Sequence, residues 1–82
     1  MSLYFLSYDL RNSRNYQPLY DELNDFDAIR IVESTWSFKR VNTSASGLRD
    51  HFRKYIDSDD GIIVSEVSGW ASYSTDGTPK NL

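Results

Sequence analysis

Hydrophobic and polar residues alternate along the first part of the chain with the two-residue period of a β-strand. This strand is predicted over residues 3–10, and a carboxylate, Asp9, lies near its end. The residues of its two faces are Tyr4, Leu6 and Tyr8 on one side and Leu3, Phe5 and Ser7 on the other. Because both faces carry apolar side chains, we expect both to be at least partly covered in the folded protein.

Two later segments have the spacing of amphipathic helices. The first has Tyr16, Leu19, Tyr20, Leu23 and Phe26 on one face. Asn15 is its candidate N-cap, and Pro18 is tolerated because it falls in the first turn. The second has Ala45, Leu48, Phe52, Tyr55 and Ile56 on one face, with basic residues near its end, which suits the helix dipole.

Two further segments are predicted as strands. Residues 28–40 are rich in β-branched and aromatic residues but exceed the usual strand length, so we expect a bend, bulge or tight turn near residues 33–35. Residues 61–67 form a nearly continuous apolar run, which predicts a strand in the centre of the sheet. Trp70, Ala71 and Tyr73 could add a short fifth strand, and residues 74–82 read as a polar, flexible tail.

The resulting order, β-α-β-β-α-β, predicts an α+β domain of the ferredoxin-like type over residues 1–73. Its four-stranded antiparallel sheet would carry both helices on one face. Two helices cannot cover both sides of the sheet, although the first strand is apolar on both. We therefore expect the uncovered face to be a dimer surface.

Composition narrows the classes of function. The 82 residues contain no cysteine, which excludes disulfides, thiolate metal sites and a cysteine nucleophile. The net charge is −3, but residues 1–56 hold eight basic and seven acidic residues, whereas residues 57–82 hold one basic and five acidic residues. A local basic surface is therefore compatible with the first part of the chain. With no basic leader or long apolar run visible, we expect a cytoplasmic location.

Three segments resemble the CRISPR-associated protein Cas-two superfamily, which includes the virulence-associated protein D toxins and the stand-alone SinR-like proteins. They are Tyr4-Phe5-Leu6-Ser7-Tyr8-Asp9-Leu10, Arg30-Ile31-Val32-Glu33-Ser34-Thr35-Trp36 and the acidic turn at residues 57–64. The first is similar to a family strand that ends in a Tyr-Asp pair. The second is similar to the family's Arg-Val-Gln-x-Ser-Val-Phe segment. Residues 3–67 fall within the resemblance.

The resemblance implies a ferredoxin-like homodimer in which Asp9 of each chain faces its mate and holds a divalent metal, Mg²⁺ or Mn²⁺. It implies either a weak metal-dependent endonuclease or toxin acting on RNA or DNA, or a non-catalytic adaptor or regulator. Partners of these classes would be nucleic acid and an integrase-type or antitoxin protein. Two departures stand out: Glu33 replaces the family's amide, and the chain is acidic overall, which argues against tight DNA holding.

Asp9 is the candidate catalytic residue and metal ligand, because phosphodiester hydrolysis needs a metal and carboxylates are its natural ligands. The alternative is that Asp9 caps the strand end by accepting hydrogen bonds from loop amides near residues 12–13. Candidate nucleic-acid-binding residues, whose positive charges suit phosphate, are Arg11, Arg14, Lys39 and Arg40. Whether the chain is an enzyme stays open at this stage.

Other polar and aromatic residues favour structural roles. Arg49, Arg53 and Lys54 fit a solvated helix surface at least as well as a basic track, and His51 lies at the boundary of the apolar stripe. Ser7 and Ser34 have no basic neighbour in sequence that would activate a nucleophile. Trp36 and Phe38 could stack on bases, but packing is the commoner use of aromatic residues on a strand.

Overall fold

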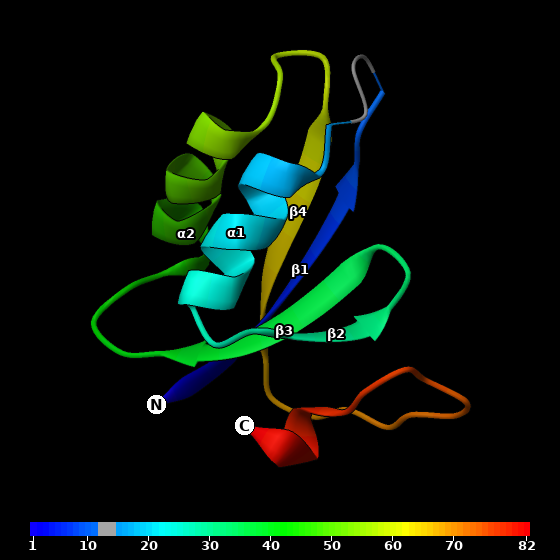
Figure 1. Ribbon diagram of the computed structural model, residues 1–82. Helices are drawn as coiled ribbons and strands as arrows, with labels where there is room; N and C mark the ends of the chain where they lie inside the picture. The colour runs from blue at the N-terminus through cyan, green and yellow to red at the C-terminus, as the bar shows by residue number, and fades with distance from the viewer. Residues whose placement is uncertain (12–14) are drawn as a thin grey trace.

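The computed structural model describes residues 1–11 and 15–82 and has the predicted element order. The elements are β1 (Ser2–Asp9), α1 (Gln17–Asp25), β2 (Ile29–Val32), β3 (Thr35–Arg40), α2 (Ala45–Phe52), η1 (Arg53–Tyr55), β4 (Gly61–Val67) and η2 (Pro79–Asn81). The four strands described here form one antiparallel sheet in the order β2-β3-β1-β4 (Figure 1). The ferredoxin-like fold is therefore confirmed.

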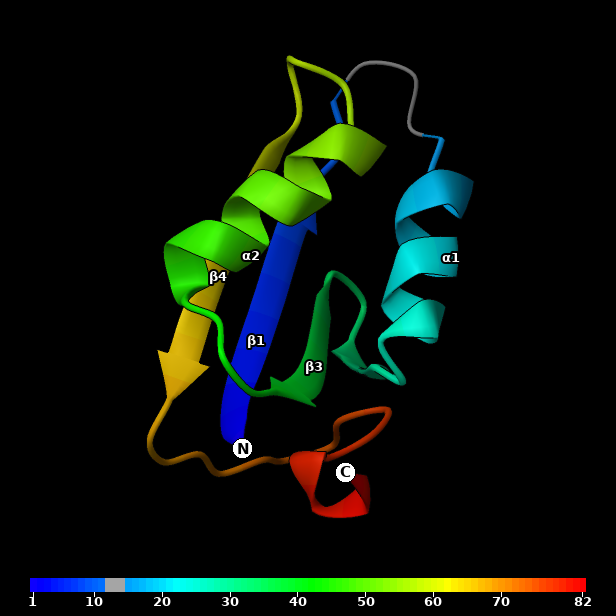
Figure 2. The ribbon, with the colours of Figure 1, turned by 90° about the vertical axis from the view of Figure 1, so that its left-hand side faces the viewer.

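Both helices lie on the same face of the sheet (Figure 2). The side chains of β1 show this directly, since Tyr4, Leu6 and Tyr8 are buried while Leu3, Phe5 and Ser7 keep partial exposure. Alternate residues of a strand point to opposite faces. The first set consequently faces the helices, and the second set, continued by the exposed Asp9, lies on the opposite face.

The long apolar segment 28–40 divides where the sequence predicts. A turn at Glu33 and Ser34 separates β2 from β3, and the pairing between these strands shifts register between Arg30 and Val32. The prediction that residues 61–67 form a central strand is wrong. β4 pairs only with β1 and lies at the edge of the sheet, and its apolar character arises because Ile62 and Val64 pack against the core.

Of the two helices, the second begins at a polar N-cap, whereas the prediction of Asn15 as N-cap of the first is wrong by one residue. The Oδ1 atom of Asn15 accepts a hydrogen bond from the Gln17 amide at 3.3 Å, although Tyr16 occupies the N-cap position. Ser44 is the N-cap of α2, and its Oγ accepts a hydrogen bond from the Gly47 amide at 3.1 Å. The second predicted helix tightens after Phe52 into the short η1 turn.

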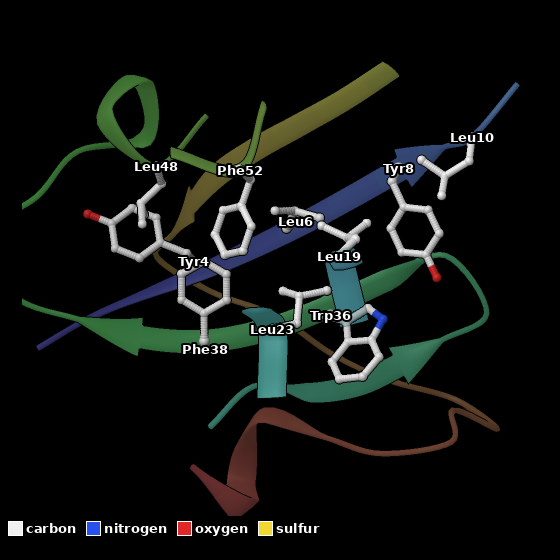
Figure 3. Close-up of a cluster of buried hydrophobic side chains, with 10 residues drawn as sticks. All are labelled: Tyr4, Leu6, Tyr8, Leu10, Leu19, Leu23, Trp36, Phe38, Leu48 and Phe52. Carbon is white, nitrogen blue, oxygen red and sulfur yellow. The ribbon is translucent and has the colours of Figure 1, made fainter. Parts of the chain in front are cut away.

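Aromatic rings fill the space between the sheet and the helices (Figure 3). Phe38 of β3 is at its centre and is fully buried. Its ring centroid lies 5.9 Å from that of Tyr4, 5.3 Å from Phe26 and 5.8 Å from Phe52. These partners come from β1, the end of α1 and α2, so Phe38 connects the sheet to both helices.

The segment after β4 differs from the prediction for it. Residues 70–73 form no fifth strand, and residues 74–82, predicted as a polar tail, lie against β2. The Asp76 amide donates a hydrogen bond to the Ile31 carbonyl at 2.9 Å, and Pro79 is buried. Gly77 passes so close to β2 that an added Cβ would lie 2.7 Å from the Arg30 carbonyl oxygen. The absence of a side chain at this position permits the contact.

Tyr8 carries a partly buried hydroxyl in a small hydrogen-bond network. Its hydroxyl lies 2.9 Å from that of Tyr20 and donates to the Glu33 carbonyl at 3.1 Å. Burial, followed by the hydrogen bond with Tyr20, raises the pKa of Tyr8 from 10.0 to about 12. The folded state therefore holds this phenol in its neutral form where the unfolded chain ionises it.

We expect this raised pKa to make the protein sensitive to alkali. The stability contributed by neutral Tyr8 is complete below pH 10.0 and is lost as the pH rises through about 12. Tyr8→Phe removes the ionisable group, so its urea midpoint should fall less steeply over this interval than that of the wild type. Tyr73→Phe, at a side chain that is 92% exposed, is the control. Equal slopes for Tyr8→Phe and wild type would contradict the assignment.

Candidate functional site at the end of β1

Asp9 ends β1 on the face of the sheet opposite the helices. It pairs with Gly61, the first residue of β4, and its side chain is 70% exposed. This position follows from the alternation along β1, which directs Asp9 to the same side as Phe5 and Ser7. The carboxylate is thus presented to solvent where β1 and β4 meet the loops that join them to the helices.

Arg11 is the nearest charged neighbour of Asp9. Its Nε donates to Asp9 Oδ2 at 3.0 Å, and its Nη1 donates to the Asp59 carbonyl at 3.3 Å. The guanidinium also lies against Gly61, where an added Cβ would be 2.8 Å from Nη2. A side chain at position 61 would displace this guanidinium, so glycine allows the arginine to lie between β1 and the acidic loop.

The loop before β4 is held by Asp60, whose role the sequence reading missed. Its Oδ1 accepts a hydrogen bond from the Arg11 amide at 2.6 Å, and its Oδ2 accepts one from the Asp57 amide at 2.9 Å. One carboxylate therefore connects the end of β1 to the start of its own loop. The sequence does contain a pattern that indicates this role, an Asp-x-x-Asp-Gly turn, because aspartate in such turns commonly accepts hydrogen bonds from backbone amides.

A shallow hollow of about 310 Å³ borders the candidate site. It is lined by Ser7, Tyr8, Asp9, Arg11, Gly61, Ile62 and Ile63. The hollow combines one carboxylate, one guanidinium and an apolar floor. This combination suits a phosphate-bearing ligand near Arg11 and a cation near Asp9.

A single chain is a poor fit to a divalent metal. In residues 1–11 and 15–82, no three Asp, Glu or His side chains converge on a point where they could hold an ion. Arg11 lies between Asp9 and the loop that carries Asp59 and Asp60, so these carboxylates do not gather around Asp9. A metal at Asp9 would need a second carboxylate, and a symmetry-related chain is the source that requires no further residue.

Of the four residues predicted to bind nucleic acid, the three that the structure describes do not form one surface. Arg11 lies at the Asp9 end of β1, whereas Arg40 pairs with Ser2 at the other end of that strand. Lys39 and Arg40 also point to opposite faces: Lys39 donates to the Leu82 carbonyl at 3.4 Å, and the Arg40 guanidinium lies 3.9 Å from the centre of the Phe26 ring. Arg14 falls outside the described residues, as do Asn12 and Ser13, the expected donors to a strand-capping Asp9.

The other polar residues singled out from the sequence have structural partners. His51 is half-buried, and its Nε2 lies 2.5 Å from Glu22 Oε2, which links α2 to α1. Ser7 Oγ lies 2.7 Å from Thr35 Oγ1, with no histidine or lysine partner in the described structure. Trp36 and Phe38 are buried against the helices and present no surface on which a base could stack.

No known protein-family profile matches the chain, and no solved structure matches its fold significantly. In the ranges 1–11 and 15–82, no helix combines the length and apolar character that crossing a membrane requires.

Proposed function

We propose that the protein is a Cas-two-like homodimer that acts on nucleic acid as a weak, metal-dependent endonuclease or toxin. Asp9 serves as the metal ligand and catalytic residue, and Arg11 contacts the phosphate. One observation carries the proposal. Asp9 is an exposed carboxylate on the uncovered side of the sheet, at the rim of a hollow that also contains a guanidinium.

The uncovered face supports association of two chains. The C-terminal segment covers the β2 side of this face, whereas its β1 and β4 side keeps an apolar strip formed by Leu3, Phe5, Ile63 and Val67. Ile63 is 63% exposed and continues this strip, and a contiguous exposed apolar strip is typical of a surface that another chain covers. A two-fold axis near the carboxyl end of β1 brings the two Asp9 side chains together.

In this dimer, Asp9 and Arg11 have separate roles. The paired Asp9 carboxylates provide the negative charge that holds the cation, and Arg11, already beside Asp9, orients the phosphate by donating hydrogen bonds. When bound, Mg²⁺ or Mn²⁺ supplies charge neutralisation at the phosphate and a water of lowered pKa. The Arg11–Asp9 bond must loosen as the cation enters, which fits a weak activity.

A non-catalytic adaptor or regulator is the second candidate. It is favoured by the direct ion pair between Asp9 and Arg11, which leaves the carboxylate partly neutralised, and by the separation of Lys39 and Arg40 from the site. The net charge of −3 makes a protein partner more suitable than long DNA for such an adaptor.

A cleavage assay on the wild-type protein separates these functions. Single-stranded RNA and double-stranded DNA are incubated with Mg²⁺, with Mn²⁺ and with EDTA, and light scattering on the same sample gives the oligomeric state. We expect a dimer that cleaves slowly with either metal and not with EDTA. A dimer that leaves both substrates intact would support the adaptor. A monomer at micromolar concentration would contradict both forms of the proposal.

A further inference from the structure

The two edges of the sheet differ in how well they are protected. Exposed strand edges invite pairing with other chains, and proteins usually shorten, bend, charge or cover them. The β2 edge is protected in three of these ways: it has four residues, it shifts register, and Asp76 donates its amide to the Ile31 carbonyl. It therefore offers no free template for a further strand.

The β4 edge, in which Glu66 is the one charged residue, lacks these three protections. It has seven residues in unbroken register with β1, and it contains no proline, lysine or arginine. The Tyr8 amide donates a hydrogen bond to the Ser34 carbonyl, so the backbone groups of Tyr8, and of every second residue of β1, point toward β3. The β4 residues opposite them are Ile62, Val64 and Glu66. Their backbone N–H and C=O groups therefore point away from β1, outward from the sheet. These groups make no hydrogen bond within the described structure.

A groove runs beside this edge, between β4 and α2. One part, of about 350 Å³, is lined by Ala45, Ser46, Arg49, Ile62, Ile63 and Val64. The next part, of about 440 Å³, is bordered by Arg49, Arg53, Gly61 and Ile62 with the loop at residues 56–60. A strand edge beside a helix is the geometry in which added peptide strands bind, with backbone bonds to the strand and side chains in the groove.

We propose that β4 binds an extended, acidic peptide segment of a partner protein as a fifth strand of the sheet. Arg49 borders both parts of the groove and makes only an exposed ion pair with its neighbour Asp50, while Arg53 has no ion pair in the described structure. These two guanidinium groups select carboxylate side chains on the face of the peptide toward α2.

Acidic residues at both ends of the groove restrict where the carboxylates of the peptide can bind. Asp57 and Asp60 border the far end of the groove, and Glu66 lies at the other end of β4, so the acidic side chains belong opposite Arg49, near the middle. A second copy of the chain suits the edge less well. Antiparallel pairing of two β4 strands places two α2 helices side by side, with Arg49 and Arg53 facing their like-charged equivalents.

Fluorescence anisotropy with a synthetic peptide tests the proposal. The probe is a labelled, capped heptapeptide of alternating valine and glutamate, compared with the same peptide N-methylated at alternate residues and with a version carrying lysine for glutamate. We expect saturable binding of the first peptide and binding weaker by about tenfold or more for each of the others. The methyl groups are placed on the glutamates, whose amides face β4 when the peptide pairs antiparallel with its glutamate side chains toward α2. Equal binding of this peptide would overturn strand addition, because the hydrogen bonds to β4 require those backbone donors.

Variants of the protein locate the site. Arg49→Glu should weaken binding by about tenfold, whereas Lys54→Glu, the same charge change outside the groove, should have little effect. Glu66→Pro removes one outward N–H at an exposed edge position and should weaken binding relative to Glu66→Gln, which removes the same charge but keeps the N–H. Thermal unfolding by circular dichroism confirms that each variant is folded.

Two results would overturn the proposal. One is absence of binding by the acidic peptide to a folded wild-type protein. The other is a dimer that excludes the peptide and dissociates in Glu66→Pro, which would assign the β4 edge to a second copy of this chain. The first result leaves the proposed function at Asp9 unaffected. The second would also count against a two-fold axis at Asp9, and the cleavage assay with Mg²⁺ or Mn²⁺ then tests the proposed function separately.

Discussion

Replacing Phe38 with alanine should remove a large part of the protein's stability. The side chain is fully buried, and its ring packs on Tyr4, Phe26 and Phe52. Truncation of a buried phenylalanine costs about 3–5 kcal/mol, because the cavity adds to the lost transfer energy. A chain of 82 residues has a total stability of roughly 4–12 kcal/mol. Urea titration followed by circular dichroism should show the transition of Phe38→Ala at a clearly lower urea concentration than that of the wild type.

Tyr73→Ala is the matched control for this substitution. It also removes an aromatic ring, but Tyr73 is 92% exposed and lies outside the core cluster. Its unfolding midpoint should stay close to that of the wild type. If Phe38→Ala loses no more stability than Tyr73→Ala, the assignment of Phe38 as the residue that joins the sheet to both helices is wrong.

Replacing Asp9 with asparagine should abolish metal-dependent cleavage of nucleic acid. Asparagine keeps the size and the position of the side chain but removes the charge that two facing chains need to hold a divalent cation. Loss of that interaction should reduce the cleavage rate by about 100-fold or more. The stability should change by less than about 1 kcal/mol, because the ion pair with Arg11 is solvent-exposed.

Asp50→Asn provides the control for Asp9→Asn. Each aspartate makes a 3.0 Å ion pair with an arginine close in sequence, and both side chains are more than half exposed. The two substitutions therefore remove the same charge and the same kind of surface ion pair. Cleavage should be unchanged in Asp50→Asn. Equal activity of Asp9→Asn and wild type would show that Asp9 is a structural residue at the strand end.

The fold was predictable because the hydrophobic periods change cleanly along the chain. Strand alternation over residues 3–10 and helical spacing over residues 16–26 both correspond to observed elements. The position of β4 was not predictable in the same way. Ile63 continues the apolar run of β4 although its side chain is exposed on the uncovered face. The edge strand β4 therefore has the apolar composition that is typical of a central strand.

The candidate site was only partly predictable. Asp9 was identified from its place after an apolar strand, and Arg11 from its proximity in sequence. Sequence spacing could not show that Lys39 and Arg40 point to opposite faces at the far end of β1, since that depends on strand register. The contact of Gly77 with β2 joins residues more than forty positions apart, and a polar segment gives no hydrophobic signal for such a contact.

The pairing of two Asp9 side chains is the central claim, and cysteine cross-linking tests it most directly. The chain contains no cysteine, so Asp9→Cys introduces a single thiol at the proposed two-fold axis, and Ser46→Cys introduces one at the exposed start of α2. Disulfides require Cα atoms within about 7 Å, and short bifunctional thiol reagents extend that range slightly. We predict rapid formation of covalent dimer by Asp9→Cys and little by Ser46→Cys. Failure of Asp9→Cys to cross-link in a sample that light scattering shows to be dimeric would contradict the symmetric site.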